Sequence, residues 1–194
     1  MESINFKSAL QNLNSVGFSP EPNLVHIHIT ESKKAILAGL THFVGEKAQW
    51  QPEYEKVAEW LSNNDGRGLL CLGSCGRGKT LLCGKIIPVL LNYYCRKIVS
   101  CYDAQKMNEK LDDVKSQHII YLDDIGTENM SVKFGEKRNA FPELVDEAEK
   151  KGKLLMISTN LTLDQLKTKY GERTVDRLRA ITTPVLFKGE SLRK

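Results

Sequence analysis

The sequence lacks any hydrophobic run of the length that a membrane requires. No stretch approaches the roughly 20 consecutive apolar residues of a spanning helix, and the first seven residues hold no basic region followed by an apolar core. We therefore expect neither a membrane partner nor a secretory signal. With 41% hydrophobic and 27% charged residues, the composition is typical of a soluble globular protein of the cytoplasm.

The cysteines lack the spacing of a metal site or a disulfide framework. None of the five forms a C-x-x-C pair, and they are scattered over expected strands, a loop and a helix of the first half of the chain. Such scatter favours small buried residues in a reducing cytoplasm. A large excess of one charge sign is absent too. The net charge of +4 permits an anionic partner but does not require one.

The glycines gather where the chain carries its clearest motif. The pattern G-x-x-x-x-G-K-T of a phosphate-binding P-loop is formed by Gly73, Ser74, Cys75, Gly76, Arg77, Gly78, Lys79 and Thr80. Glycines let backbone N–H groups point at a phosphate, Lys79 places a positive charge against the β- and γ-phosphates, and Thr80 offers a hydroxyl to Mg²⁺. An apolar run at residues 68–72 and a helical pattern after Thr80 supply the strand and helix that the motif needs. We expect this loop to bind ATP and Mg²⁺.

Two aspartates follow a second apolar run at residues 119–122. A buried strand there would deliver the Asp123 carboxylate to the Mg²⁺ shell, through water, and Asp124 would point elsewhere and polarise the attacking water. Two aspartates that merely end a strand in a turn are the alternative, which the P-loop upstream disfavours. The run therefore indicates a metal ligand at Asp123 and a catalytic group at Asp124.

Three further side chains are candidates for catalysis. Asn160 ends another apolar run and would hold the attacking water or touch the γ-phosphate, although asparagine also serves turn geometry. Arg173 and Arg177 share one face of an expected helix. They are either an arginine finger that stabilises transition-state charge or surface partners of Glu172 and Asp176.

The order of elements predicts an α/β fold, with strands that alternate with helices in a parallel sheet covered on both faces. We expect a loosely ordered arm over residues 1–23 and a strand at 25–29. His26 and His28 would share a face of that strand. They are either a solvated pair or a pair of metal ligands, and the solvated pair is favoured because the sequence shows no third ligand. Helices are expected from Thr30 or Ser32 to 44 and over 52–61. We divide the chain into an N-terminal arm and helical extension, 1–61, and an ATPase domain, 62–194.

Within 62–194 the expected elements alternate regularly. A kink, or a helix end and restart, is expected near Gly84 and Pro88, and Thr162 with Gln165 forms a capping box. Expected strands are residues 68–72, 97–102, 118–124, 153–160 and 184–187. Expected helices are one that begins at 81 and contains Pro88, and those at 104–114, 139–151, 162–171 and 172–180.

Residues 66–194 resemble the AAA+ ATPases of the DnaC/IstB type, bacterial helicase loaders and transposition helper ATPases. The matching motifs are residues 73–80, 120–126 with Asp-Asp at 123–124, 158–160, 170–178, and the G-x-S-x-R of 189–193. The resemblance implies a P-loop NTPase fold of three α/β/α layers, a five-stranded parallel sheet and no C-terminal lid domain. It also implies that Arg177 is the finger and that Arg193 contacts the nucleotide.

For function, the resemblance implies an ATPase of DNA replication or transposition that converts ATP to ADP and phosphate. It implies assembly into a nucleotide-dependent homo-oligomer, and contact with single-stranded DNA and a replicative helicase or transposase. The alternative is an ATP-dependent switch with slow hydrolysis that holds a DNA-bound partner. A P-loop kinase is disfavoured by the strand ends at Asp123 and Asn160. Two features depart from the family pattern. Arg77 in the P-loop is expected to place an extra cation beside the phosphates, which would tighten binding or perturb turnover. The arm before residue 24 is short for a helicase-binding domain.

A small basic cluster follows the two aspartates. Lys133, Lys137 and Arg138 lie in an expected loop near the carboxyl ends of the strands. The cluster is either a solvated charged loop or a contact for the phosphates of single-stranded DNA.

Overall fold

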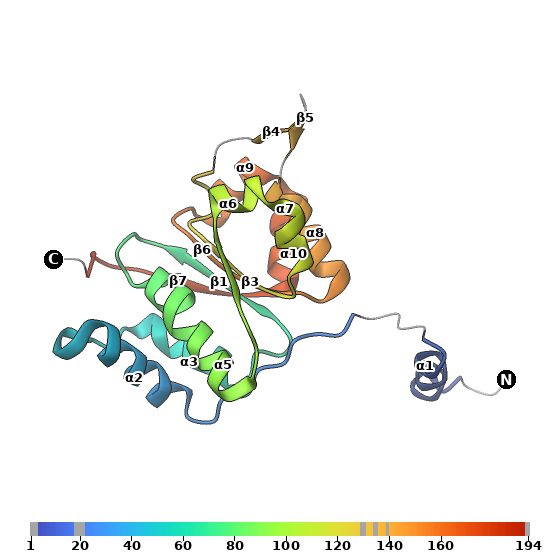
Figure 1. Cartoon of the computed structure of the whole chain (residues 1–194), viewed down its shortest axis with the longest axis horizontal. Coiled ribbons are helices and arrows are strands. Elements are labelled where there is room, and N and C mark those ends of the chain that lie inside the picture. The colour runs from blue at the N-terminus through green and yellow to red at the C-terminus, as the bar shows by residue number, and fades with distance from the viewer. Residues whose placement is uncertain (1–3, 18–21, 129–130, 134–135, 139, 193–194) are drawn as a thin grey trace.

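Five parallel strands form the centre of the molecule (Figure 1). The computed structural model describes residues 4–17, 22–128, 131–133, 136–138 and 140–192. The strand order across the sheet is β2-β3-β6-β1-β7, and every neighbouring pair runs parallel. The strands are β1 (Gly68–Gly73), β2 (Ser100–Asp103), β3 (Ile119–Asp123), β6 (Leu154–Thr159) and β7 (Thr182–Phe187). The predicted five-stranded parallel sheet is confirmed.

Helices cover both faces of this sheet, because successive side chains of a strand point to opposite sides. Leu69 and Cys71 of β1 join one hydrophobic core, and Leu70 and Leu72 join the other. The first core is closed by α2 (Ser32–Val44), α3 (Pro52–Ser62) and α5 (Ile87–Cys95). The second core is closed by α6 (Ala104–Glu109), α7 (Leu111–Ser116), α8 (Ala140–Lys151), α9 (Leu163–Tyr170) and α10 (Glu172–Ile181). Figure 1 shows the two helical layers above and below the sheet, so the three-layer architecture is confirmed.

Residues 25–29 run extended along this body without entering the sheet. Val25, Ile27 and Ile29 are buried, whereas His26 and His28 are exposed. The Asn64 side chain accepts a hydrogen bond from the Ile27 N–H and donates to the Val25 carbonyl, both at 2.8 Å. The predicted alternation is correct and the predicted strand is wrong, since the backbone groups bond an amide side chain. No metal-binding cluster of three or more His, Cys, Asp or Glu occurs among the described residues.

The N-terminal segment differs from its prediction in two places. A helix, α1 (Phe6–Ser15), occupies the expected arm and buries none of its residues. The predicted cap of α2 is wrong. Glu31 is the residue before the helix and its side chain does not cap a backbone N–H, and the Ser32 hydroxyl pairs with the Ser62 hydroxyl at 2.8 Å. Because Val25 to Leu61 contribute to the same core as β1, this segment packs as part of the body. The division at residue 61 stays a prediction.

The helical segment after the P-loop is continuous but irregular. It runs from α4 (Lys79–Leu81) through a π-helical turn, η2 (Leu82–Ile86), into α5. Pro88 lacks an N–H, and the α-carbon of Gly84 packs so closely on the Tyr121 ring that an added β-carbon would lie 2.9 Å from it. The distortion predicted near Gly84 and Pro88 therefore takes the form of a π turn.

Several smaller elements complete the chain. The predicted helix at 104–114 is divided at Lys110 into α6 and α7, and the capping box of Thr162 and Gln165 is confirmed at the start of α9. A short antiparallel hairpin, β4 (Ser131–Lys133) and β5 (Glu136–Arg138), stands where a loop was expected. A 3-10 turn, η1 (Gly45–Lys47), follows α2. Among the described helices, none combines the length and apolarity needed to cross a bilayer.

Candidate nucleotide-binding site

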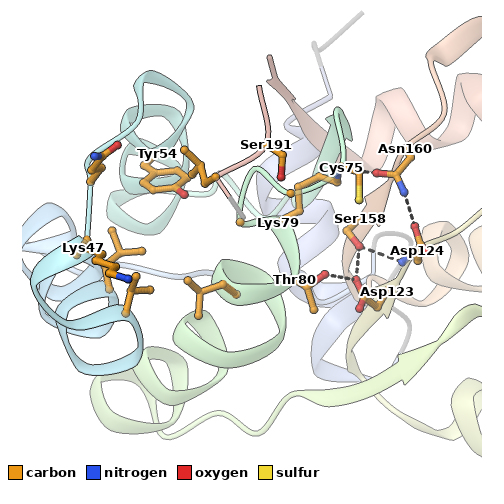
Figure 2. A pocket seen from close by; sticks show the side chains of 18 residues that line it. Lys47, Tyr54, Cys75, Lys79, Thr80, Asp123, Asp124, Ser158, Asn160 and Ser191 are labelled. Atoms are coloured by element: carbon orange, nitrogen blue, oxygen red, sulfur yellow. Dashed lines mark hydrogen bonds between the residues drawn. The ribbon is translucent and has the colours of Figure 1, made fainter. Parts of the chain in front are cut away.

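A cavity of about 1050 Å³ opens at the carboxyl ends of β1, β3 and β6 (Figure 2). Parallel α/β sheets bind ligands at this edge. One end of the cavity is polar and is lined by Lys79, Thr80, Asp123, Asp124, Ser158 and Asn160. The rest of the lining is mainly apolar and includes Leu40, Val44, Ala48, Tyr54, Leu81 and Leu192, with Lys47 and Gln49 as its polar members. The cavity thus offers separate environments to a charged group and to an apolar ring.

The P-loop curls over the polar end. Gly73, Gly76 and Gly78 have φ angles of 116°, 77° and 87°, which side chains with a β-carbon rarely adopt. The Lys79 ammonium donates to the carbonyls of Gly73 at 2.6 Å and Ser74 at 2.8 Å. The loop therefore holds Lys79 at its centre, beneath the place where a phosphate would lie.

Lys79 also reaches the neighbouring strand. Its ammonium donates to the Asn160 amide oxygen at 2.8 Å. Burial lowers the pKa of Lys79 from its usual value, and nearby groups including Asp123 and Asp124 partly oppose this shift. A ligand with negative charge would replace the partners of this buried cation and favour its charged form.

Asp123 is the point where three donors meet. Its Oδ1 accepts hydrogen bonds from the hydroxyls of Thr80 at 3.0 Å, Tyr121 at 2.5 Å and Ser158 at 2.5 Å. Burial and the negative groups nearby raise the pKa of the Tyr121 phenol, so Tyr121 stays a neutral donor. The Asp123 carboxylate is consequently fixed in one orientation beside Thr80.

Asp124 turns away from its neighbour, as the sequence predicts. Its φ of 56° is left-handed, and its N–H donates to the Ser158 hydroxyl at 3.0 Å. Its carboxylate accepts a hydrogen bond from the Asn160 amide at 2.8 Å. Asn160 therefore bridges Lys79 and Asp124 across the polar end, as the dashed lines in Figure 2 show.

The oxygen atoms present suit Mg²⁺. Mg²⁺ prefers one or two protein oxygens together with waters and phosphate oxygens. The Thr80 hydroxyl and the Asp123 carboxylate meet that requirement, because they are in direct contact at 3.0 Å and both line the cavity. These two residues would hold the ion between the P-loop and β3.

The Arg77 side chain does not take the place that the sequence predicts for it. The guanidinium is buried and bonds Glu53 at 2.7 and 2.9 Å and the Gln51 side chain at 2.8 Å. It is absent from the residues that line the cavity. The predicted phosphate contact of the Arg77 side chain is therefore wrong in this structure, because a carboxylate outside the cavity binds the charge.

The two arginines of α10 lie outside the cavity lining. Arg177 forms ion pairs with Asp146 and Glu149 of α8, the latter at 2.9 Å. Arg173 is exposed, and neither of the expected partners, Glu172 and Asp176, is paired with Arg177 in the described part of the chain. Arg193 and the side chains of Lys133, Lys137 and Arg138 lie outside the described residues.

The sequence prediction missed two groups of residues. Tyr121 and Ser158 support Asp123 from within β3 and β6, where their types look like ordinary strand residues. The apolar wall of Leu40 and Val44 from α2, with Ala48 after η1, was missed because it precedes the P-loop by some 30 residues and carries no motif. The only available signal was the apolar stripe of α2, which also fits a helix packed on a core.

Solved structures share this fold at low sequence identity. The structure entitled "Crystal structure of the DnaC helicase loader" aligns with a TM-score of 0.55 and 19% identity, covering 83% of this chain and 93% of that one. The DnaI structure aligns with a TM-score of 0.53 and 20% identity, covering 84% of this chain and 85% of that one. Domain III of the replication initiation protein DnaA from Thermotoga maritima aligns with a TM-score of 0.56 and 19% identity, covering 74% of this chain and 65% of that one. The predicted resemblance to DnaC-type AAA+ proteins is confirmed as a likeness of fold.

Sequence comparison assigns the family. A search of curated protein sequences found no match. A family profile described as Novel STAND NTPase 3 matches residues 51–185, which include the P-loop, both aspartates, Asn160 and the two arginines of α10. The chain belongs to the Novel STAND NTPase 3 family and has the fold of the DnaC-type AAA+ ATPases.

Proposed function

We propose that this protein binds and hydrolyses ATP with Mg²⁺ as an AAA+ ATPase of DNA replication or transposition. The observation that carries the proposal is the convergence of Lys79, Thr80, Asp123, Asp124 and Asn160 on one cavity from three strand ends. Residues far apart in the sequence meet there in the arrangement that phosphoryl transfer to water needs. The family name, a STAND NTPase, supports the same activity.

Each side chain has a distinct task in this mechanism. Lys79 leaves its three oxygen partners and binds the β- and γ-phosphates, whose charge it neutralises. Thr80 and Asp123 would hold Mg²⁺, which would neutralise charge on the phosphate oxygens. Asp124 accepts a proton from the attacking water, and Asn160 orients that water through its contact with Asp124. The apolar end of the cavity receives the base.

The partners belong to the proposal as well. DnaC is named a helicase loader, and the fold likeness supports a helicase-loader-like or transposase-helper role for this chain. We propose a nucleotide-dependent homo-oligomer that contacts single-stranded DNA and a replicative helicase or transposase. The five free cysteines support a cytoplasmic location.

A titration with a fluorescent ATP analogue tests the central step. Wild-type protein should bind the analogue with Mg²⁺, and Lys79→Ala should lose measurable binding because the charge on the β- and γ-phosphates is gone. Turnover should then be measured with and without single-stranded DNA. Lys188→Ala, an exposed lysine after β7, is the matched control and should bind normally. Equal affinity of wild type and Lys79→Ala would contradict the assignment.

A second candidate is the switch that binds ATP, hydrolyses it slowly and holds a DNA-bound partner. The ion pairs of Arg177 favour the switch, because both are formed with carboxylates of its own chain. Without a finger, the γ-phosphate receives less transition-state stabilisation. Tight ATP binding with turnover that neither DNA nor higher protein concentration accelerates would support the switch over the ATPase.

A further inference from the structure

The P-loop is held from outside the cavity by one buried ion pair. Arg77 lies in the loop, Glu53 lies in the first turn of α3, and both are at least 93% buried. Gln51, just before α3, accepts a further hydrogen bond from the guanidinium. The next residue of α3, Tyr54, donates from its hydroxyl to the Arg77 carbonyl at 3.1 Å. The side chain and the backbone of Arg77 are thus both fixed to the start of α3.

The same guanidinium holds a segment that follows β7. Arg77 donates to the Glu190 carbonyl at 3.3 Å, and the Leu192 N–H donates to the Gly76 carbonyl at 2.9 Å. Contact with the loop is close, because a β-carbon added to Gly76 would lie 2.1 Å from the Ser191 hydroxyl oxygen. Residues 189–192 therefore lie directly on the P-loop.

This segment also forms part of the cavity. Ser191 and Leu192 line it, as do Leu40, Val44 and Leu81. The Leu192 side chain is 41% exposed although it is apolar. A nucleotide in the cavity would cover this surface and gain apolar contact from it.

A buried ion pair contributes little net stability, because removing two charges from water offsets their attraction. The ion pair acts instead through its geometry, since a planar guanidinium that bonds three groups fixes their relative positions. Here those groups belong to the start of α3 and to residues 189–192, with the P-loop between them.

We propose that Arg77 is a positioning residue that latches residues 189–192 against the P-loop, so that this segment forms a wall of the nucleotide site and slows nucleotide release. The inference rests on the proposed function, because the cavity must bind a nucleotide. It assigns to Arg77 a role in the site that needs no contact with phosphate.

The dissociation rate of a fluorescent ATP analogue, chased with excess ATP, tests the latch. The variant Arg77→Gln/Glu53→Gln removes both charges together, so no unpaired charge stays buried. A second variant, Glu190→Gly/Ser191→Gly/Leu192→Gly, loosens the segment and leaves the ion pair intact. Each should release the analogue about tenfold faster than wild type, and combining them should add little, because both act through one contact. Lys115→Gln/Glu143→Gln removes a partly buried pair between α7 and α8 and should leave release unchanged.

Amide hydrogen exchange provides a readout without nucleotide. In wild type the Leu192 amide should exchange slowly, and Arg77→Gln/Glu53→Gln should lose that protection while the β1 amides stay protected. Wild-type release rates in both variants would overturn the latch, as would unchanged protection at Leu192. If the Gln variant fails to fold, Arg77→Met/Glu53→Leu, which replaces the same pair by apolar side chains, is measured in its place. If wild type binds no analogue, the proposed function fails, whereas the exchange result still tests the contact with Arg77.

Discussion

At the scale of single residues, the site depends on how firmly Asp123 is held. Its Oδ1 accepts from Thr80, which belongs to the P-loop, and from Tyr121 and Ser158, which belong to the sheet. The sheet side fixes the carboxylate whether or not an ion is bound. Metal affinity should therefore depend on hydroxyl groups that never touch the metal.

Tyr121→Phe tests this dependence. Loss of the hydroxyl removes one of three donors to Asp123, so the Mg²⁺ concentration for half-maximal ATP turnover should rise about tenfold. Turnover at saturating Mg²⁺ should recover most of its wild-type value. Tyr102→Phe, a partly buried tyrosine of the neighbouring strand β2, is the control. An unchanged Mg²⁺ dependence would show that Ser158 suffices to orient Asp123.

Asp124→Asn separates the roles of the two aspartates. The amide keeps the shape of the side chain but accepts a proton poorly, so ATP binding should persist while hydrolysis falls about 100-fold or more. Binding is measured by titration and hydrolysis by single-turnover phosphate release. Asp123→Asn should instead weaken Mg²⁺ binding. If Asp124→Asn loses binding while each bound ATP turns over normally, the two roles are reversed.

The residues that the sequence predicts and the structure brings together belong to local patterns. Lys79 and Thr80 are fixed by the spacing of one motif, and Asp123 follows a buried strand. Arg77 could not be predicted in the same way. Its partner Glu53 lies 24 residues upstream on a helix whose position depends on the whole core. A local pattern reveals that a charge is present, but the tertiary packing decides which charge it meets.

At the scale of elements, the π turn of η2 places the P-loop helix against the sheet. Gly84 lies where the helix crosses Tyr121, the same residue that supports Asp123. A glycine lowers helix propensity by about 1 kcal/mol relative to alanine. Its presence here is explained by the close approach to the buried Tyr121 ring.

Gly84→Ala should therefore destabilise the protein despite the gain in propensity. Its β-carbon would meet a ring that has no room to move, and overpacking costs about 1–3 kcal/mol. Subtracting the gain in propensity of about 1 kcal/mol leaves a net loss of up to about 2 kcal/mol in the free energy of unfolding, measured with urea. Asn92→Ala, exposed on α5, gains propensity without new contacts and should not destabilise. A more stable Gly84→Ala protein would show that η2 can relax away from the sheet.

The sequence predicts a helix or strand where that element buries one face or both faces, because burial leaves an apolar pattern in the sequence. Runs of apolar residues predicted the strands of the sheet, and apolar stripes at helical spacing predicted α2 and α8. The hairpin of β4 and β5 has a polar sequence without an apolar run, so nothing local distinguishes it from a loop. Residues 25–29 have the alternation of a strand, yet their backbone bonds Asn64 and the Leu61 carbonyl, which only the folded chain brings near.

At the scale of the whole molecule, the candidate site receives no arginine from the part of its own chain that the structure describes. No arginine lines the cavity among the described residues. Arg177 is held by Asp146 and Glu149 across α8 and α10, with its side chain 21% exposed. Glu149→Gln would loosen this hold without touching the cavity. We therefore expect an arginine finger, where the ATPase uses one, to come from a neighbouring subunit.

The last prediction is that Arg177 acts on the nucleotide of a neighbouring subunit. ATPase activity per subunit should rise with protein concentration, because each site is complete only at an interface. Lys79→Ala subunits still carry the finger and Arg177→Ala subunits still bind ATP, so mixing these two inactive proteins should restore part of the activity. Arg173→Ala in the same mixture shows whether the exposed arginine one turn earlier contributes, and Arg179→Ala, exposed on α10, is a control that should be active alone. A mixture that stays inactive, beside wild-type activity independent of concentration, would confine Arg177 to its ion pairs with α8.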